Sequence, residues 1–274
     1  MRDDLIREIN SHIDEERAAR TRHYFGIYKG GYGEKDELLG VPNPVLRKIA
    51  ANFSKLSRPD IEGLLQSRIH EFRFVALCIL EKQYKKNPRE TVEIYLNHLD
   101  YINNWDLVDC FASHIIGQWC LDNQDETILI KLNQKSSLWR RRISLVAYQA
   151  FYRKGILSNG LELIDQRIED PEDLMHKACG WMLREIYSKV DRQVVESYLI
   201  DNYDRLSRTT LRYAIERMPE AQRQKYLKRD FRWKNKTFNP MSQKNAGLAM
   251  RTRFVIQMKI RPSKVRAYRN LSMG

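Results

Sequence analysis

The sequence predicts an all-α superhelix of stacked helix pairs, and three observations support that prediction. Apolar residues recur at three- and four-residue steps along most of residues 1–220, a spacing typical of amphipathic helices. The connectors between these runs are short and rich in Asn, Asp, Pro or Gly. The helical runs also recur at about 35 residues, the period of helix-pair solenoids. Because one pair cannot bury its apolar face alone, neighbouring pairs stack and leave a concave face of exposed side chains.

The predicted helices follow one another along the chain. Leu5, Ile6, Ile9 and Ile13 share one face of a first helix, with charged residues on the other face. Later helical runs cover residues 72–84, 104–119, 138–152, 174–187 and 207–217. The glycine-rich stretch Lys29-Gly30-Gly31-Tyr32-Gly33 lacks the strand-to-helix context of a phosphate-binding loop, so we expect a flexible loop between helices there.

The charge divides the chain into a body and a tail. The 274 residues carry a net charge of +13. Residues 221–274 hold 15 Lys and Arg but one acid, a net charge of +14, which leaves −1 for residues 1–220. We therefore expect a helical domain over 1–227 and a basic, weakly structured extension over 228–274. The extension either attracts nucleic-acid phosphates or is a solvated or cloning-derived segment with no role.

Composition excludes several classes of protein. No apolar run approaches the roughly 18 residues of a membrane span, and the charged N-terminus does not resemble a secretory signal. The four cysteines form no Cys-x-x-Cys pair, so we expect reduced thiols in a cytosolic protein. The six histidines are scattered without ligand spacing, so neither a metal nor a cofactor is predicted.

The repeat places one carboxylate among cations. Aligning the repeats puts these residues at equivalent positions: Arg73, Asp109, Arg142, Lys177 and Arg212. If this position lines the concave face, Asp109 is an acid in a basic groove. Nearby cations would then favour its ionised form, and its presence there indicates chemistry. The alternative is an Asp–Arg pair that locks adjacent repeats together.

Two tryptophans accompany this carboxylate. Trp105 and Asp109 lie four residues apart and so share a helix face, and Asn104 is the expected N-cap of that helix. Trp181 lies one turn beyond Lys177. Indole faces stabilise cations, and a carboxylate stabilises positive charge that develops on a sugar ring. The alternative is that both tryptophans belong to the core.

Four stretches taken together resemble the AlkD-like DNA alkylation repair proteins, which are HEAT-like-repeat DNA glycosylases. The resemblance runs from about residue 20 to Leu227. The stretches are Phe25 through Leu39-Gly40-Val41-Pro42 with Arg47, Asn103-Asn104-Trp105-Asp106-Leu107-Val108-Asp109, Leu138-Trp139-Arg140-Arg141-Arg142, and His176-Lys177-Ala178-Cys179-Gly180-Trp181-Met182-Leu183-Arg184-Glu185. The resemblance implies a solenoid of HEAT-like helix pairs with a concave DNA-binding face. It also implies a monofunctional glycosylase that releases cationic N3- or N7-alkylated purines from duplex DNA.

The resemblance also implies roles for particular residues. Asp109 matches the catalytic aspartate, and Trp105 and Trp181 match the two tryptophans of the cleft. Arg142 matches an arginine suited to a phosphate oxygen, and Tyr24 matches a tyrosine near the start of the cleft.

Two further cations are candidates for phosphate contacts. Arg47 either contacts phosphate or is a structural arginine. Lys177 either contacts phosphate, packs between helices or acts as a Schiff-base nucleophile. We further expect a monomer that works without a cofactor in the cytoplasm, associated with the nucleoid. The rival hypotheses are a HEAT-repeat protein that binds bent or branched DNA without excision, and a scaffold that binds other proteins.

Overall fold

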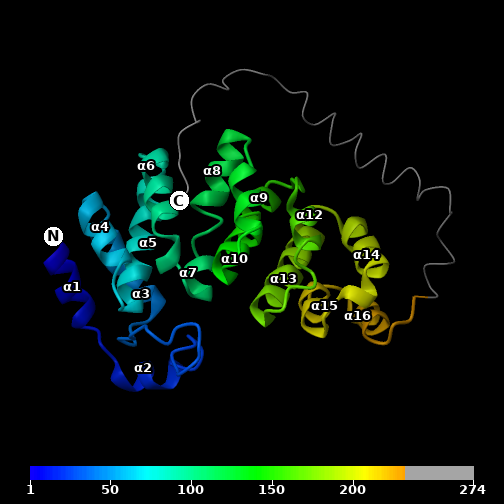
Figure 1. The fold of residues 1–274 in the computed structure, drawn as a ribbon, viewed down its shortest axis with the longest axis horizontal. Helices are drawn as coiled ribbons and strands as arrows, with labels where there is room; N and C mark the ends of the chain where they lie inside the picture. Colours follow the sequence, from blue (N-terminus) through cyan, green and yellow to red (C-terminus); the bar gives the residue numbers. More distant parts are fainter. Residues whose placement is uncertain (232–274) are drawn as a thin grey trace. The chain divides into compact units, whose positions relative to one another are not determined.

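The computed structural model describes residues 1–231, and all regular elements in that part of the chain are helices (Figure 1). The all-α prediction is confirmed. The chain divides into a first unit, Met1–Pro219, and a second unit that begins at Glu220. The helices are α1 (Arg2–Asn10), α2 (Glu15–Thr21), α3 (Asn43–Asn52), α4 (Arg58–Leu65), α5 (His70–Tyr84), α6 (Pro88–Asn97), η1 (Leu99–Tyr101), α7 (Trp105–Asp109), α8 (Ile116–Asn123), α9 (Thr127–Asn133), α10 (Leu138–Val146), α11 (Gln149–Tyr152), α12 (Gly160–Asp165), α13 (Asp173–Lys189), α14 (Arg192–Asp201), η2 (Tyr203–Arg205), α15 (Arg208–Ala214) and, in the second unit, α16 (Glu220–Leu227).

The domain boundary predicted after Leu227 stays a prediction. Residues 232–274, which make up most of the expected basic extension, lie outside the described residues. Within residues 1–231, no helix is long and apolar enough to cross a membrane. The four cysteines are free thiols, and Cys110 is the one among them that is partly exposed.

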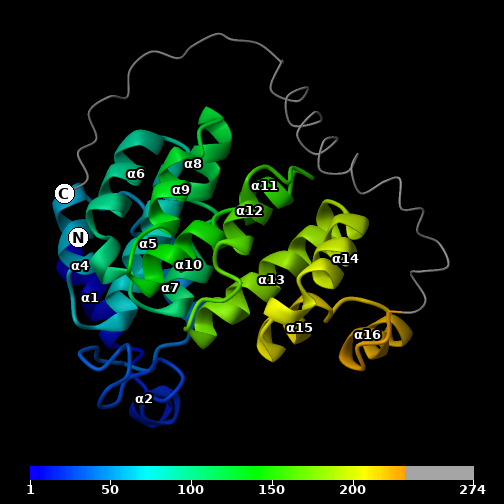
Figure 2. The ribbon, with the colours of Figure 1, turned by 45° about the vertical axis from the view of Figure 1, so that its right-hand side comes forward.

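The helices of the first unit stack in chain order (Figures 1 and 2). One layer consists of α3, α5, α7, α10, α13 and α15, each in contact with the next, while α4, α6, α9 and α14 pack against members of this layer. Helix α5 is buried at every residue from His70 to Leu80, because other helices surround it. The predicted solenoid of stacked helix pairs therefore accounts for the packing.

Hydrogen bonds between side chains connect neighbouring repeats. Arg58 donates to Glu93 at 3.0 Å, 35 residues away, and Tyr84 donates to Asp122 at 2.9 Å, 38 residues away. Tyr198 donates to Asp165 at 3.0 Å, 33 residues away. The period that the sequence predicts is thus the separation at which adjacent repeats bond to each other.

Two of the predicted helical runs are broken in the structure. The run over 104–119 divides into α7 and α8, and the run over 138–152 divides into α10 and α11. A Cβ atom at Gly117, in α8, would lie 2.2 Å from the carbonyl oxygen of Ala147, which lies between α10 and α11. The start of α8 thus packs closely against the backbone at the break between α10 and α11. The first helix also ends earlier than predicted, at Asn10, and Ile13 is exposed beyond it.

The glycine-rich segment lies between α2 and α3, as expected, and backbone hydrogen bonds and close contacts organise it. The Gly33 amide donates to the Gly26 carbonyl at 3.0 Å, and a Cβ at Gly31 would lie 2.1 Å from that same oxygen. Farther along, Arg73 of α5 donates to Asp36 through two nitrogens. Glu71, also of α5, accepts hydrogen bonds from the backbone amides of residues 39 and 40. These contacts fix the segment between α2 and α3 to the central helix.

Candidate active site

Asp109 and Arg142 form a bidentate ion pair between adjacent repeats. Arg142 Nε donates to Asp109 Oδ1 at 2.9 Å, and Arg142 Nη2 donates to Asp109 Oδ2 at 2.7 Å. The third nitrogen, Nη1, donates to the carbonyl oxygen of Leu174. The sequence allowed an Asp–Arg pair that locks adjacent repeats together, and this pair is present. It joins the end of α7 to α10.

Two other Asp–Arg pairs within residues 1–231 are more deeply buried than this one. Asp36 and Arg73 expose 4% and 3% of their side chains, and Asp170 and Arg141 expose 2% and 9%. Asp109 exposes 17%, although its partner Arg142 exposes 5%. The Asp109 carboxylate is therefore held by a buried guanidinium, while its side chain stays partly exposed.

The five equivalent positions do not form a uniform basic face. Arg73 is sealed inside the unit by its pair with Asp36, Lys177 pairs with Asp173 at 2.7 Å, and Arg212 is exposed. We expected Asp109 to be surrounded by cations in a basic groove. Arg73 does not line such a groove, because the packing around α5 buries it.

The pKa of Asp109 also differs from expectation. Burial raises the pKa of Asp109 above its ordinary value, the Arg142 guanidinium lowers it, and the Asp106 carboxylate raises it. The sequence led us to expect that cations would dominate, but desolvation outweighs them. Asp109 therefore takes up a proton more readily than a solvated aspartate does.

Trp105 is fixed at the start of α7. Asn104 caps this helix as predicted, because its Oδ1 accepts a hydrogen bond from the Trp105 amide at 2.9 Å. The indole Nε1 donates to the carbonyl oxygen of Tyr24 at 3.0 Å. The indole also stacks on Phe25, with ring centroids 5.7 Å apart and an interplanar angle of 17°. Trp105 remains partly exposed, and Asp109 ends the same short helix.

Trp181 and Lys177 come from the next helix of the layer. Both lie on α13, which contacts α10, the helix that carries Arg142. The side chain of Trp181 is partly exposed, so it is not sealed in the core. Lys177 is bonded to Asp173 within α13 and not to Asp109.

The remaining two predicted site residues, Tyr24 and Arg47, differ from each other in their surroundings. Tyr24 exposes 73% of its surface, and its backbone carbonyl binds the Trp105 indole. Arg47 pairs with Glu81 at 3.2 Å, and its guanidinium lies over the rings of Phe74 and Phe111 at 5.5 and 5.2 Å. Tyr24 therefore adjoins Trp105, whereas Arg47 is bonded elsewhere on the first unit.

Sequence reasoning missed three residues next to Trp105. Tyr32 donates to the carbonyl oxygen of Tyr24, which Trp105 also uses. His70 Nε2 and Asp106 Oδ2 lie 2.9 Å apart, and both side chains are buried. The spacing of His70 and Asp106, 36 residues, is one repeat and could have identified that pair. Tyr32 gave no such signal, because its glycine neighbours are typical of open loops.

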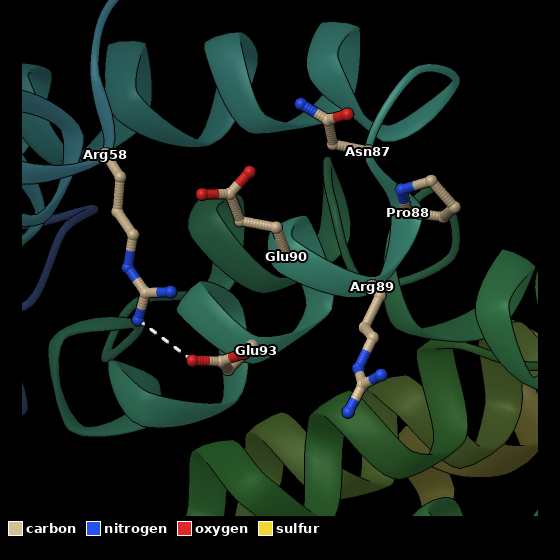
Figure 3. A pocket seen from close by; sticks show the side chains of 6 residues that line it. All are labelled: Arg58, Asn87, Pro88, Arg89, Glu90 and Glu93. Atoms are coloured by element: carbon tan, nitrogen blue, oxygen red, sulfur yellow. Dashed lines mark hydrogen bonds and ion pairs between the residues drawn. The ribbon is translucent and has the colours of Figure 1, made fainter. Parts of the chain in front are cut away.

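One surface hollow is lined by residues other than these. It adjoins α4 and α6 and is lined by Arg58, Asn87, Pro88, Arg89, Glu90 and Glu93 (Figure 3). Arg58 and Glu93 bond across it, and none of the predicted site residues lines it. In the described part of the chain, no group of three or more His, Cys, Asp or Glu side chains could hold a metal ion.

Comparison with known proteins places this chain in a family. No curated protein sequence matches the chain. A solved structure described as a predicted DNA alkylation repair enzyme from Enterococcus faecalis is similar, with a TM-score of 0.62 and 19% sequence identity. That match covers 76% of this chain and 98% of the other. The family model for DNA alkylation repair enzymes matches residues 5–218, which include α7, α10 and α13. The chain therefore belongs to the DNA alkylation repair enzyme family.

Proposed function

We propose that this protein is a monofunctional DNA glycosylase that hydrolyses the N-glycosidic bond of cationic N3- or N7-alkylated purines in duplex DNA. The observation that carries the proposal is the state of Asp109. Its carboxylate accepts two hydrogen bonds from Arg142, its side chain is 17% exposed, and the partly exposed Trp105 lies on the same short helix. We propose further that the protein acts as a monomer, without a cofactor, in the cytoplasm and on the nucleoid.

The chemistry of the substrate suits a lone carboxylate. An N-alkylated purine already carries a positive charge, so the base leaves with the electron pair of the bond between C1′ and nitrogen and becomes neutral. The sugar then develops positive charge, which a nearby carboxylate stabilises. A water molecule adds to C1′, and the carboxylate of Asp109 accepts its proton. No strong general acid is needed, because the leaving base is neutral once the bond has broken.

The tryptophans suit the same transition state. Indole faces attract cations, so Trp105 and Trp181 can pack beside a sugar ring as it becomes positive. Both are partly exposed and lie on helices on either side of α10 in the packed layer. We propose that they contact the sugar and backbone beside the lesion.

The cations have separate roles in this proposal. The Arg142 guanidinium donates hydrogen bonds to Asp109 and to the Leu174 carbonyl oxygen. A phosphate contact by Arg142 would have to replace one of these bonds. We propose that Arg142 chiefly orients Asp109. Tyr24, Arg47 and Lys177 are more exposed than Arg142 and are proposed to contact the DNA backbone.

Incubation of the full chain with duplex DNA that contains N7-methylguanine or N3-methyladenine tests the proposal. We expect free methylpurine and an abasic site. Tight binding of bent or branched DNA with no release of base would favour the non-catalytic alternative. Neither release nor duplex binding would favour the protein-binding scaffold.

A further inference from the structure

We propose that Tyr32 is a positioning residue for Trp105, and that the segment from Tyr24 to Asp36, here named the clamp segment, holds the indole in a fixed orientation. The inference rests on the proposed function, in which Trp105 packs beside the lesion. Neither the periodicity of the sequence nor the helical packing assigns any role to Tyr32.

Two donors converge on one carbonyl group. The Tyr24 oxygen accepts a hydrogen bond from the Tyr32 hydroxyl at 2.8 Å and another from Trp105 Nε1 at 3.0 Å. The next residue, Phe25, stacks on the same indole, and its carbonyl oxygen accepts from Asn104 Nδ2 at 2.9 Å. The indole and the cap of α7 are therefore both bonded to consecutive residues of the clamp segment.

The ring of Tyr32 is itself confined. It meets Trp139 edge-on, with ring centroids 5.2 Å apart and an interplanar angle of 72°. On another side it touches Gly26, where a Cβ atom would come within 2.7 Å of the ring. Burial raises the pKa of Tyr32 to about 12, which favours the protonated phenol that donates to the Tyr24 carbonyl.

The clamp segment has an anchor that is independent of Trp105. Asp36 is buried in its pair with Arg73 of α5, and the backbone of Glu37 forms a bridge with Ile69 just before that helix. Trp139 lies on α10, three residues before Arg142. The Tyr32 ring therefore also contacts the helix whose Arg142 binds Asp109. The segment thus links α5, α7 and α10 at the candidate site. A fixed indole loses less conformational freedom when it packs on the substrate, which lowers the barrier to reaction.

The test compares two loop glycines that share a left-handed backbone. Gly26 has φ +65°, and a Cβ there would strike the Tyr32 ring, whereas Gly30 has φ +80° with no atom within 4 Å of such a Cβ. We would record indole N–H signals of the ¹⁵N-labelled full chain for wild type, Tyr32→Ala, Tyr32→Phe, Gly26→Ala and Gly30→Ala, and identify the Trp105 signal from its loss in Trp105→Phe.

We expect the Trp105 indole signal to shift and its proton to exchange faster in Tyr32→Ala and Gly26→Ala. The signal of Trp119, which lies on α8, should stay in place. Gly30→Ala should leave the Trp105 indole signal where it is in wild type. Tyr32→Phe, which keeps the ring, should shift that signal less than Tyr32→Ala does. Release of methylpurine under single-turnover conditions should fall about tenfold in Tyr32→Ala with unchanged duplex affinity.

An unchanged Trp105 signal in Tyr32→Ala would overturn the inference. If Tyr32→Ala fails to fold, an unchanged signal and exchange rate in Tyr32→Phe would overturn it instead. A wild-type protein that releases no base would refute the proposed function, but the indole signals would still decide whether Tyr32 holds Trp105.

Discussion

Asp109 combines a structural bond with solvent access. Its two hydrogen bonds from Arg142 join neighbouring repeats, as other acid–base pairs do along this chain. What distinguishes it is the 17% of its side chain that remains exposed. The structural and the catalytic interpretations therefore apply to the same carboxylate, and variants must separate them.

The pH dependence of base release should report on this carboxylate. The proposed reaction needs ionised Asp109, and burial raises its pKa, so the rate should fall with decreasing pH at a higher pH than the value of about 3.9 for a solvated aspartate. Arg142→Gln removes the group that lowers this pKa, so the acidic limb should move to still higher pH. Single-turnover rates between about pH 4 and pH 8 would show both effects.

Arg140→Gln is the matched control for that measurement. Arg140 lies on the same helix but pairs with Asp100, so its loss should leave the acidic limb in place. An acidic limb in Arg142→Gln that coincides with wild type would contradict the assignment of the titrating group to Asp109.

Trp105→Ala and Trp181→Ala should each slow base release by about tenfold, which is within the range for cation–π contacts. Because both side chains are partly exposed, the melting temperature should change little. Trp139→Ala, which empties a buried position, should instead destabilise the fold by about 3–5 kcal/mol. Unfolding of the first two variants, seen by circular dichroism, would show instead that both tryptophans are core residues.

At the scale of elements, contacts between helices depend on glycines within them. Gly180 of α13 lies so close to α15 that an added Cβ would come 2.5 Å from the carbonyl oxygen of Thr210. Alanine normally stabilises a helix interior by about 1 kcal/mol over glycine. Here the overlap should reverse that sign, and Gly180→Ala should lower stability by about 1–3 kcal/mol.

Gly63→Ala, in α4, is the control for this prediction. Its nearest neighbours are atoms of the Arg2 guanidinium at 3.1 to 3.4 Å, which can move aside. We expect Gly63→Ala to melt at or slightly above the wild-type temperature. Equal melting temperatures for the two variants would show that the close contact between α13 and α15 is not needed for stability.

The sequence predicted the stacking better than the boundaries of its helices. The recurrence of about 35 residues identified the runs that became α5, α7, α10, α13 and α15, because each repeat must bury a similar apolar face. It did not reveal the break between α7 and α8, because apolar residues continue through 110–115 although the chain forms turns there.

The repeat also made part of the candidate site predictable from the sequence. Trp105, Asp109 and Arg142 are spaced by a helical turn and by one repeat, and the structure bonds the last two together. Tyr32 could not be found in this way. It reaches Trp105 through a loop whose path depends on backbone contacts at Gly26, Gly31 and Gly33 rather than on any period.

At the scale of the whole molecule, charge is divided unevenly. Residues 1–220 are close to neutral, and the excess of positive charge lies in residues 221–274. If these charges contact DNA, truncation after Leu227 should reduce the slope of log affinity against log salt concentration, since each phosphate contact contributes about 0.9 to that slope. Equal slopes for the full and truncated chains would leave the C-terminal charges without a role in binding.

The most direct test of the central claim compares Asp109→Asn with Asp170→Asn. Both variants weaken an ion pair to an arginine of α10, but Asp170 exposes only 2% of its side chain. Single-turnover release of N7-methylguanine from duplex DNA should fall at least about 100-fold in Asp109→Asn while duplex binding persists. Release by Asp170→Asn should stay close to wild type. A rate in Asp109→Asn equal to wild type would contradict the claim that Asp109 performs the chemistry.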